Sequence, residues 1–159
     1  MATSLKVQAE QESRHEPRVP FAELHCKSNF SFLQGASHPE ELVRRAKELG
    51  YEAIAITDEC SLSGIVKAHV AAMQQGIKLI VGAEFHLSDG NDEEAVQLVL
   101  LAPTRKAYAQ LSAFITKGRR RGNKGEYELH LHDLEDTVSE CFALWIPKAL
   151  PLETLIAQG

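Results

Sequence analysis

Cysteine is scarce in this chain, which has only three such residues among 159. Cys26, Cys60 and Cys141 lie far apart, and no C-x-x-C pair occurs. This spacing argues against a disulfide framework and against a zinc ribbon, because both need closely spaced cysteine pairs. Scattered cysteines are typical of reduced proteins, so the sequence predicts a cytoplasmic location.

The chain also lacks long apolar runs and an excess of positive charge. No stretch is long and apolar enough to span a membrane, and residues 1–20 lack the apolar core of a signal peptide. The net charge is −5, whereas domains that bind nucleic acids through overall electrostatics are usually basic. Any contact with DNA must therefore be local.

The composition of the chain, with 44% hydrophobic and 25% charged residues, is that of one globular domain. Residues 1–20 are rich in Gln, Glu, Ser and Arg, which predicts a disordered leader before a folded domain at 21–159. A helix is predicted from Ser37, as its N-terminal cap, to Gly50, and a second over 63–75, where the apolar stripe is Ile65, Val66, Val70 and Met73.

Strands are predicted at 51–57, 78–87, 95–102 and 141–146, with a further helix from 104 to about 117. Two successive strand-helix units, each closed by a glycine that leads into a strand, indicate an α/β fold. Its parallel sheet would be open or barrel-like.

Residues 21–37 (FAELHCKSNFSFLQGAS) predict a strand that runs into a tight polar turn, with His25 at the strand's C-terminal end. Enzymes with α/β folds place metal ligands at such ends. The next candidates, two and nine residues later, are Lys27 and Gln34. A protonated lysine has no lone pair to donate, and an amide oxygen is a weak neutral ligand. The segment thus has the position of a metal site without its full set of ligands.

Residues 22–25 (AELH), 31–33 (SFL) and 35–37 (GAS) resemble the first motif of the polymerase and histidinol phosphatase (PHP) domain, in the form found in error-prone bacterial C-family DNA polymerases. Residues 55–64 (AITDECSLSG) resemble the second motif and residues 82–85 (GAEF) the third. The resemblance runs from about Phe21 to Pro147. It implies a distorted β/α barrel, of which this chain holds the N-terminal portion, with parallel strands alternating with helices.

Carried over residue by residue, the resemblance implies a degenerate site. His25, Asp58 and Glu84 match a histidine, an aspartate and a glutamate of the intact motifs. Three positions depart from the family's ligands, namely Lys27, Gln34 and Glu59. The Lys27 ammonium, placed among the carboxylates of Asp58, Glu59 and Glu84, would offset their mutual repulsion without a metal. The sequence favours this metal-free site; the alternative is a surviving metal site of His25, Glu59 and Glu84.

Residues 117–124 (KGRRRGNK) form a basic run, predicted to lie on a glycine-rich loop after a helix. Its cations are Lys117, Arg119, Arg120, Arg121 and Lys124, which could contact phosphates, although such runs are usually solvated. His130 and His132 would share one face of a strand. No acidic motif is tied to these two histidines, so the sequence favours a solvated edge over a ligand pair.

The resemblance implies that the chain is the N-terminal PHP segment of an error-prone DNA-directed DNA polymerase that acts in damage-tolerant DNA synthesis and repair. Nucleotidyl transfer and its Mg²⁺ would belong to a later domain, so this segment would be a scaffold with no catalytic residue and no bound cofactor. The expected partners are DNA, through the whole polymerase, and accessory proteins. Two alternatives stay open: a free-standing PHP phosphoesterase or 3'-5' exonuclease that binds Mn²⁺ or Zn²⁺, and a docking module for accessory proteins.

Overall fold

The computed structural model describes residues 19–88, 96–135 and 137–147, so the predicted leader lies almost entirely outside the described residues. The elements are β1 (Ala22–Glu23), α2 (Pro39–Glu48), β2 (Ala53–Ile56), α3 (Ile65–Gln75), β3 (Lys78–Leu87), β4 (Val96–Ala102), α4 (Arg105–Arg121), the 3-10 helix η1 (Leu131–Leu134) and β5 (Phe142–Ile146). None of the described helices has the length and apolar character needed to cross a membrane.

The five strands of the described residues form one mixed sheet in the order β1-β2-β3-β4-β5. β1, β2 and β3 are parallel, whereas β4 is antiparallel to β3 and β5 is antiparallel to β4. The prediction of parallel strands is therefore wrong for β4 and β5. Residues 88–95 alone connect β3 to β4, and a parallel crossover needs about a dozen residues or more.

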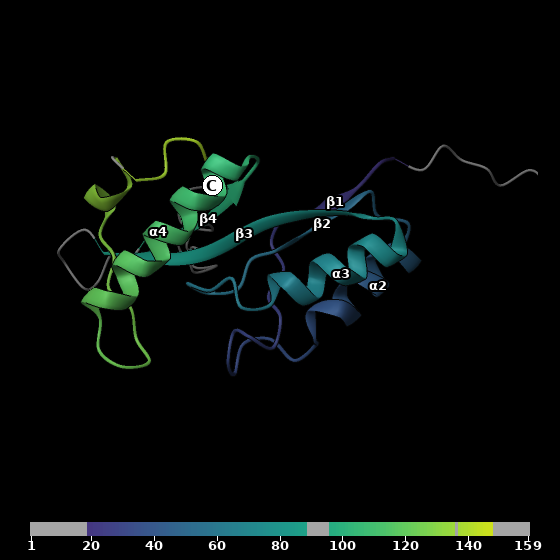
Figure 1. Ribbon diagram of the computed structural model, residues 1–159, viewed down its shortest axis with the longest axis horizontal. Coiled ribbons are helices and arrows are strands. Elements are labelled where there is room, and N and C mark those ends of the chain that lie inside the picture. Colours follow the sequence, from purple (N-terminus) through teal and green to yellow (C-terminus); the bar gives the residue numbers. More distant parts are fainter. Residues whose placement is uncertain (1–18, 89–95, 136, 148–159) are drawn as a thin grey trace, which may run out of the picture.

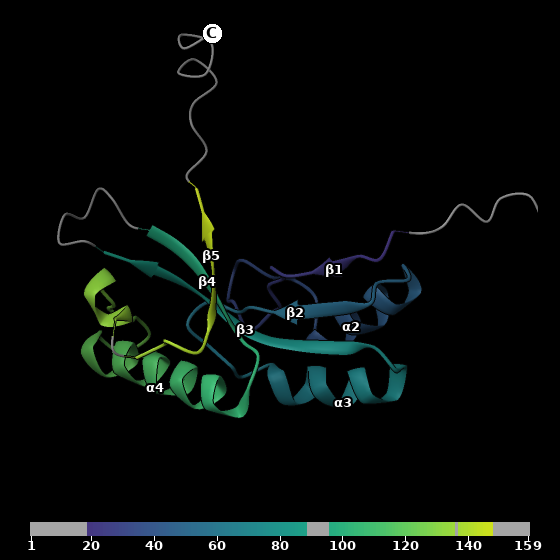
Figure 2. The same ribbon diagram turned by 90° about the horizontal axis from the view of Figure 1, so that it is seen from above.

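Figure 2 shows that β4 and β5 run across the direction of β1 and β2. The mixed sheet is thus curled, as expected for a portion of a distorted β/α barrel.

Helices α2, α3 and α4 cover one face of this sheet (Figure 1). Under α2 and α3, Val43 and Ala46 pack with Ile54 and Ile56 of β2. Under α4, the ring of Phe114 meets that of Phe85 edge-on, with centroids 5.0 Å apart. Burial of these apolar side chains supplies the main driving force for folding.

The opposite face of the sheet carries the candidate site. Successive strand residues point to opposite faces, so Phe85 of β3 points to α4 while Glu84 and His86 point away from the helices. A smaller apolar group shares this helix-free face and includes Ala55, Val99, Leu101 and, partly buried, Ile80. Glu84, whose carboxylate is fully buried, has Val99 of this group as its cross-strand partner.

Helix α2 begins one residue later than predicted, because Pro39 takes its first position and His38 becomes the N-cap. The His38 N–H donates to Oε2 of Glu41 at 2.8 Å, as expected for a capping box with Glu41 at the third helical position. Ser37 is not the cap.

Helix α3 buries a different stripe from the predicted one. Its inward face is formed by Ile65, Ala68, Ala71 and Ala72. The side chains of Val66, Val70 and Met73 are 73%, 51% and 73% exposed. Small alanines let α3 approach α2 and β3 closely, which the apolar periodicity alone did not distinguish from a stripe of larger residues.

Candidate functional site

Asp58 builds the turn that carries the first motif. Its carboxylate is 1% exposed, and Oδ1 accepts hydrogen bonds from Ser28 N at 2.7 Å and Ser31 Oγ at 2.8 Å. Oδ2 accepts a third from Ser28 Oγ at 2.7 Å. These bonds hold residues 28–31 rigidly against the end of β2.

Asp58 is therefore a structural residue of the turn and does not join the predicted carboxylate cluster around Lys27. Neighbouring residues of an extended chain point to opposite sides, so Asp58 turns to the serines while Glu59 turns toward Glu84. The prediction that Asp58 lies against the Lys27 ammonium is wrong.

Backbone hydrogen bonds between the segment after β1 and the end of β2 position His25 and Lys27, the two residues of the first motif that contact Glu84. The Thr57 N–H donates to the Cys26 carbonyl at 2.8 Å, and the Cys26 N–H donates to Thr57 Oγ1 at 3.0 Å. Cys26 is thereby fixed beside the end of β2. His25 and Lys27, on either side of it, both contact Glu84.

Glu84 is the centre of the site and has no exposed surface. Lys27 Nζ lies 2.6 Å from Oε1, His25 Nε2 contacts Oε2, and His86 Nε2 lies 3.2 Å from Oε1. Burial alone would raise the pKa of Glu84, but hydrogen bonds from Lys27 and His25, together with the charge of Lys27, outweigh it. The pKa of Glu84 therefore lies below its ordinary value, and the carboxylate is ionised at neutral pH.

A chain of hydrogen bonds continues from Lys27 to the loop after α4. Lys27 donates to the side-chain oxygen of Gln34, and the Gln34 amide donates to Oε2 of Glu59. Tyr127 OH donates to Glu59 Oε1 at 3.0 Å and accepts from the His86 N–H at 2.9 Å. Burial, followed by the charge and hydrogen bond of Glu59, raises the pKa of Tyr127, so its phenol stays protonated. The predicted residues Lys27, Gln34 and Glu59 thus lie in one network.

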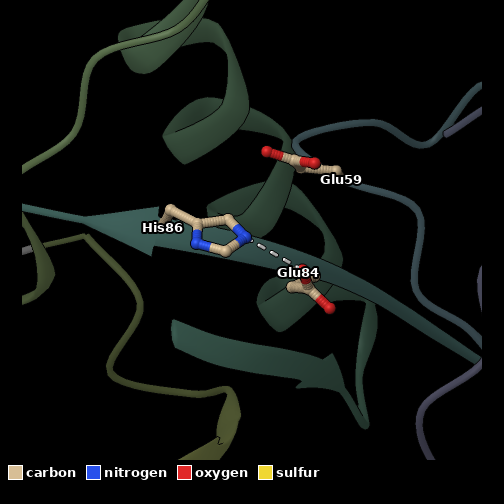
Figure 3. Close-up of side chains that lie close together, drawn as sticks. All are labelled: Glu59, Glu84 and His86. Carbon is tan, nitrogen blue, oxygen red and sulfur yellow. Dashed lines mark hydrogen bonds and ion pairs between the residues drawn. The ribbon is translucent and has the colours of Figure 1, made fainter. Parts of the chain in front are cut away.

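Figure 3 shows Glu59, Glu84 and His86 converging, with Glu84 and His86 on the same strand and Glu59 entering from the segment after β2. One ligand atom from each residue lies within 4.8 Å of the other two. This trio differs from the predicted alternative ligand set of His25, Glu59 and Glu84. His86 was missed, although its position two residues after Glu84 on a strand was a signal that both side chains share a face.

The arrangement does not fit a divalent metal ion as it stands. An ion held by Glu84 Oε1 would lie next to the Lys27 ammonium, which is 2.6 Å from the same oxygen. The two cations would repel each other in a site whose carboxylate is fully buried. The ammonium instead supplies the counter-charge that Glu84 needs.

A hollow of about 550 Å³ adjoins this network on the side of Gln34 and Glu59. The aromatic residues Phe30, Phe32 and Tyr127 line it, together with Arg119. Among the described residues, nothing in its lining forms a serine or cysteine nucleophile paired with a histidine base.

The basic run lies mostly at the end of α4, which extends to Arg121, and not on a loop as predicted. Arg119 Nε and Nη2 donate to the Cys60 carbonyl at 3.3 and 3.2 Å, and its Nη1 donates to Gly125 O at 3.3 Å. Its guanidinium also lies 5.4 Å from the centre of the Tyr127 ring. Arg119 therefore fastens the loop that carries Tyr127 to the turn after Glu59.

Two further cations of the run bind Asp133, which is 2% exposed. Arg121 Nη1 and Lys117 Nζ each lie 2.6 Å from its carboxylate oxygens. The hydrogen bond from Arg121 is the main reason that the pKa of Asp133 lies well below its ordinary value. Of the five cations predicted to contact phosphate, only Arg120 and Lys124 have no ion-pair or hydrogen-bond partner among the residues that the structure describes.

His130 and His132 do not lie on a strand. His132 belongs to η1 and is exposed, whereas half-buried His130 has its Nδ1 2.6 Å from Ser88 Oγ and its Nε2 3.0 Å from Glu128 Oε1. The two rings stack with centroids 5.2 Å apart. Within the described part of the chain, they form no group of three metal-ligating side chains, and their contacts are structural.

The arrangement of a histidine after β1, an acidic turn after β2 and a buried glutamate on β3 agrees with a match to the PHP domain over residues 23–146. The chain belongs to the PHP domain family. Similar curated proteins are error-prone DNA polymerases. That of Methylococcus capsulatus is 56% identical over 132 residues, covering 82% of this chain and 12% of the relative. That of Bordetella parapertussis is 58% identical over 115 residues, covering 72% of this chain and 11% of the relative.

Two solved structures share the fold. One, described as a metal-dependent phosphoesterase from Bifidobacterium adolescentis, has a TM-score of 0.53 and 25% identity, and the match covers 66% of this chain and 35% of that one. The other, an amidohydrolase from Chromobacterium violaceum with bound sulfate and no metal, has a TM-score of 0.51 and 30% identity over 62% of this chain and 33% of that one. The chain thus spans about a third of these neighbours and 11–12% of the two polymerases.

Proposed function

We propose that this chain is the N-terminal PHP segment of an error-prone DNA-directed DNA polymerase, acting in translesion synthesis and repair in the cytoplasm. Identity of 50–58% to proteins of that name, over most of the chain, supports this. DNA is then the substrate of the whole polymerase. Template-directed nucleotidyl transfer, with its Mg²⁺, belongs to a part of the polymerase outside these residues.

Within that enzyme the segment is a metal-free scaffold, and the contact between Lys27 Nζ and Glu84 Oε1 carries this proposal. The ammonium neutralises the buried carboxylate and connects through Gln34 to Glu59. The network thereby joins the segment after β1, the turn at 31–34, the segment after β2 and strand β3. Positions that hold metal ligands in an intact PHP enzyme thus carry side chains that bind one another in this chain and stabilise the fold.

A phosphoesterase or exonuclease is the second candidate, favoured by the fold shared with the phosphoesterase from Bifidobacterium adolescentis. That chemistry uses metal ions to polarise a phosphoryl oxygen and to generate hydroxide from bound water. In this chain the Lys27 ammonium occupies the oxygen of Glu84 that such an ion would need. The docking of accessory proteins remains a proposal about surfaces outside this network.

Two assays test the proposal. The intact polymerase should extend a primer past an abasic site in the presence of Mg²⁺. The segment should release no phosphate from a 3'-phosphorylated oligonucleotide, and no nucleotide from a DNA 3' end, in the presence of Mn²⁺ or Zn²⁺. Either hydrolytic activity, lost in Glu84→Gln, would favour the second candidate.

A further inference from the structure

We infer that the C-terminal end of helix α4 is a binding surface for the phosphates of single-stranded DNA, and that the exposed ring of His132 stacks on one of its bases. The inference rests on the proposed function, in which DNA is the substrate of the whole polymerase. It goes further, because it assigns this segment a contact of its own with an unpaired strand. The network around Glu84 takes no part in this contact.

The end of α4 gathers a large share of the positive charge of the chain. Residues 117–124 contain five of the 17 Lys and Arg residues and no acidic residue, although the chain as a whole has a net charge of −5. Arg119 is directed to the Cys60 carbonyl and the ring of Tyr127. The other four cations form the basic surface, namely Lys117, Arg120, Arg121 and Lys124. Attraction of an anion by this acidic chain is therefore local to the end of α4.

A hollow of about 530 Å³ lies on the basic surface. It is lined by residues that recur every three or four positions along one side of α4, namely Ala113, Thr116, Lys117, Arg120 and Arg121. Three of these five side chains are cationic and none is acidic. The aliphatic stems of the cations also give the hollow apolar surface beneath the charged ends. Such a lining fits a sugar-phosphate unit better than it fits a bare ion.

The fold itself uses part of this charge. Asp133 is 2% exposed, and Arg121 Nη1 and Lys117 Nζ each lie 2.6 Å from its carboxylate oxygens. The hydrogen bond with Asp133, and then the charges of Asp133 and Glu128, raise the pKa of Arg121, so Glu128 also lies near this cation. These two carboxylates therefore balance the charges of Lys117 and Arg121.

The other two cations of the basic surface exceed what the fold needs. Arg120 and Lys124 make no ion pair and no hydrogen bond within the part of the chain that the structure describes. The C-terminal end of a helix favours positive charge, but this effect is weak at exposed positions. A guanidinium matches a phosphate group with two parallel hydrogen bonds, and an ammonium binds it as a point charge. Arg120 and Lys124 are therefore assigned to contact phosphates.

A stacked pair of histidines lies beside the basic surface. His132 Nε2 lies 3.7 Å from Asp133 Oδ1, the oxygen that Lys117 Nζ also contacts. The rings of His132 and His130 stack with centroids 5.2 Å apart and planes 12° apart. The His132 side chain is nevertheless 73% exposed, so its ring offers surface on which a base can stack. Only an unpaired base can do so, which makes a single strand the ligand, in place of a duplex or a free phosphate.

The experiment measures the fluorescence anisotropy of a labelled oligothymidine titrated with the full chain over a series of salt concentrations. Arg120→Gln combined with Lys124→Gln removes the two charges without partners. Arg44→Gln combined with Lys78→Gln is the matched control, since it removes the same residue types at exposed positions of α2 and the start of β3, away from α4 (Figure 2). His132→Ala tests stacking, and His132→Phe restores an aromatic ring.

We expect the change at Arg120 and Lys124 to reduce the slope of log affinity against log salt concentration by about 1.4, which is about 0.7 for each lost contact with a single strand. The control pair should keep the slope. His132→Ala should weaken binding about fivefold or more, the scale of one stacked base, without changing the slope. His132→Phe should bind like the unaltered chain.

Three results overturn the inference. They are no binding by the unaltered chain at low salt, an equal fall of the slope in the control pair, and displacement of the oligonucleotide by inorganic phosphate as readily as by unlabelled oligonucleotide. Binding of a duplex that is as tight as that of the single strand, and that His132→Ala leaves unchanged, overturns the assignment of a single strand. The proposed function would still stand in each case, because it is tested by primer extension with the intact polymerase.

Discussion

The ammonium of Lys27 lies 2.6 Å from a carboxylate oxygen of Glu84 that has no exposed surface. The pair joins the segment after β1 to strand β3, at the place where the PHP motifs meet. Removing either partner leaves an uncompensated charge in a site that is largely shielded from water. The interaction is therefore expected to stabilise this fold.

Lys27→Met should lower the free energy of unfolding by about 3 kcal/mol, the lower end of the range for breaking a buried ion pair. The lower end applies because the Lys27 side chain is 20% exposed and water partly compensates its loss. Urea denaturation at pH 7 measures the change. Lys78→Met, at the exposed start of β3, is the control and should be nearly neutral. An equal effect of the two substitutions would contradict the role of Lys27 as the counter-charge.

Acid should destabilise the protein through Glu84. Its pKa is lower in the folded state than the ordinary value of 4.5, so the unfolded chain binds its proton first as the pH falls. The stabilising contribution is therefore complete at neutral pH, above the unfolded pKa, and is lost as the pH falls through the folded pKa. When the free energy of unfolding is measured as a function of pH, Glu84→Gln should reduce its fall at acidic pH. Glu52→Gln, at an exposed position, should leave this fall nearly unchanged.

Asp133→Asn should lower the free energy of unfolding by about 2 kcal/mol, a typical value for hydrogen bonds to charged groups. The substitution keeps the size of the side chain but leaves Arg121 and Lys117 without their counter-charge. Thermal unfolding followed by circular dichroism measures the loss. The matched change Glu135→Gln, at an exposed position two residues later, should have little effect. A neutral Asp133→Asn would show that the basic end of α4 is not anchored there.

Contact with DNA, if the basic run makes any, should depend on Arg120 and Lys124. Neutralising both in the intact polymerase should weaken binding to all DNA sequences and make the affinity less dependent on salt. Arg119 and Arg121 are unsuitable for this test, because their guanidinium groups hold Cys60 and Asp133. Fluorescence anisotropy over a salt series gives the slope. An unchanged slope would mean that the run is structural only.

The sequence predicted α2, α3 and strands β2 to β5 well because each of them has a local signal. The strand at 78–87 agrees with β3 residue for residue, and Gly76, with a φ of 61°, ends α3 as expected for a helix-terminating glycine. The direction of β4 had no such signal, since apolar runs are compatible with parallel and antiparallel pairing. The short connection of residues 88–95 was the available evidence.

The candidate site was predicted only in part, for a geometric reason. From the resemblance, Lys27 was correctly predicted to lie beside Glu84. Asp58 was wrongly predicted to face Lys27 together with Glu59, because the two acidic residues are adjacent in sequence. Backbone alternation turns Asp58 to Ser28 and Ser31 instead. Tyr127 had no local signal, because its hydrogen bond to Glu59 spans 68 positions and depends on how the loop after α4 folds back.

Metal content of the purified full chain tests the central claim most directly. The chain is dialysed against a chelator, then against buffer that contains Zn²⁺ and Mn²⁺, and finally against metal-free buffer to remove unbound ions. Elemental mass spectrometry should then find only traces of either metal per chain. One or more ions retained by the unaltered chain, and lost in Glu84→Gln, would contradict the account and make this segment a metal site.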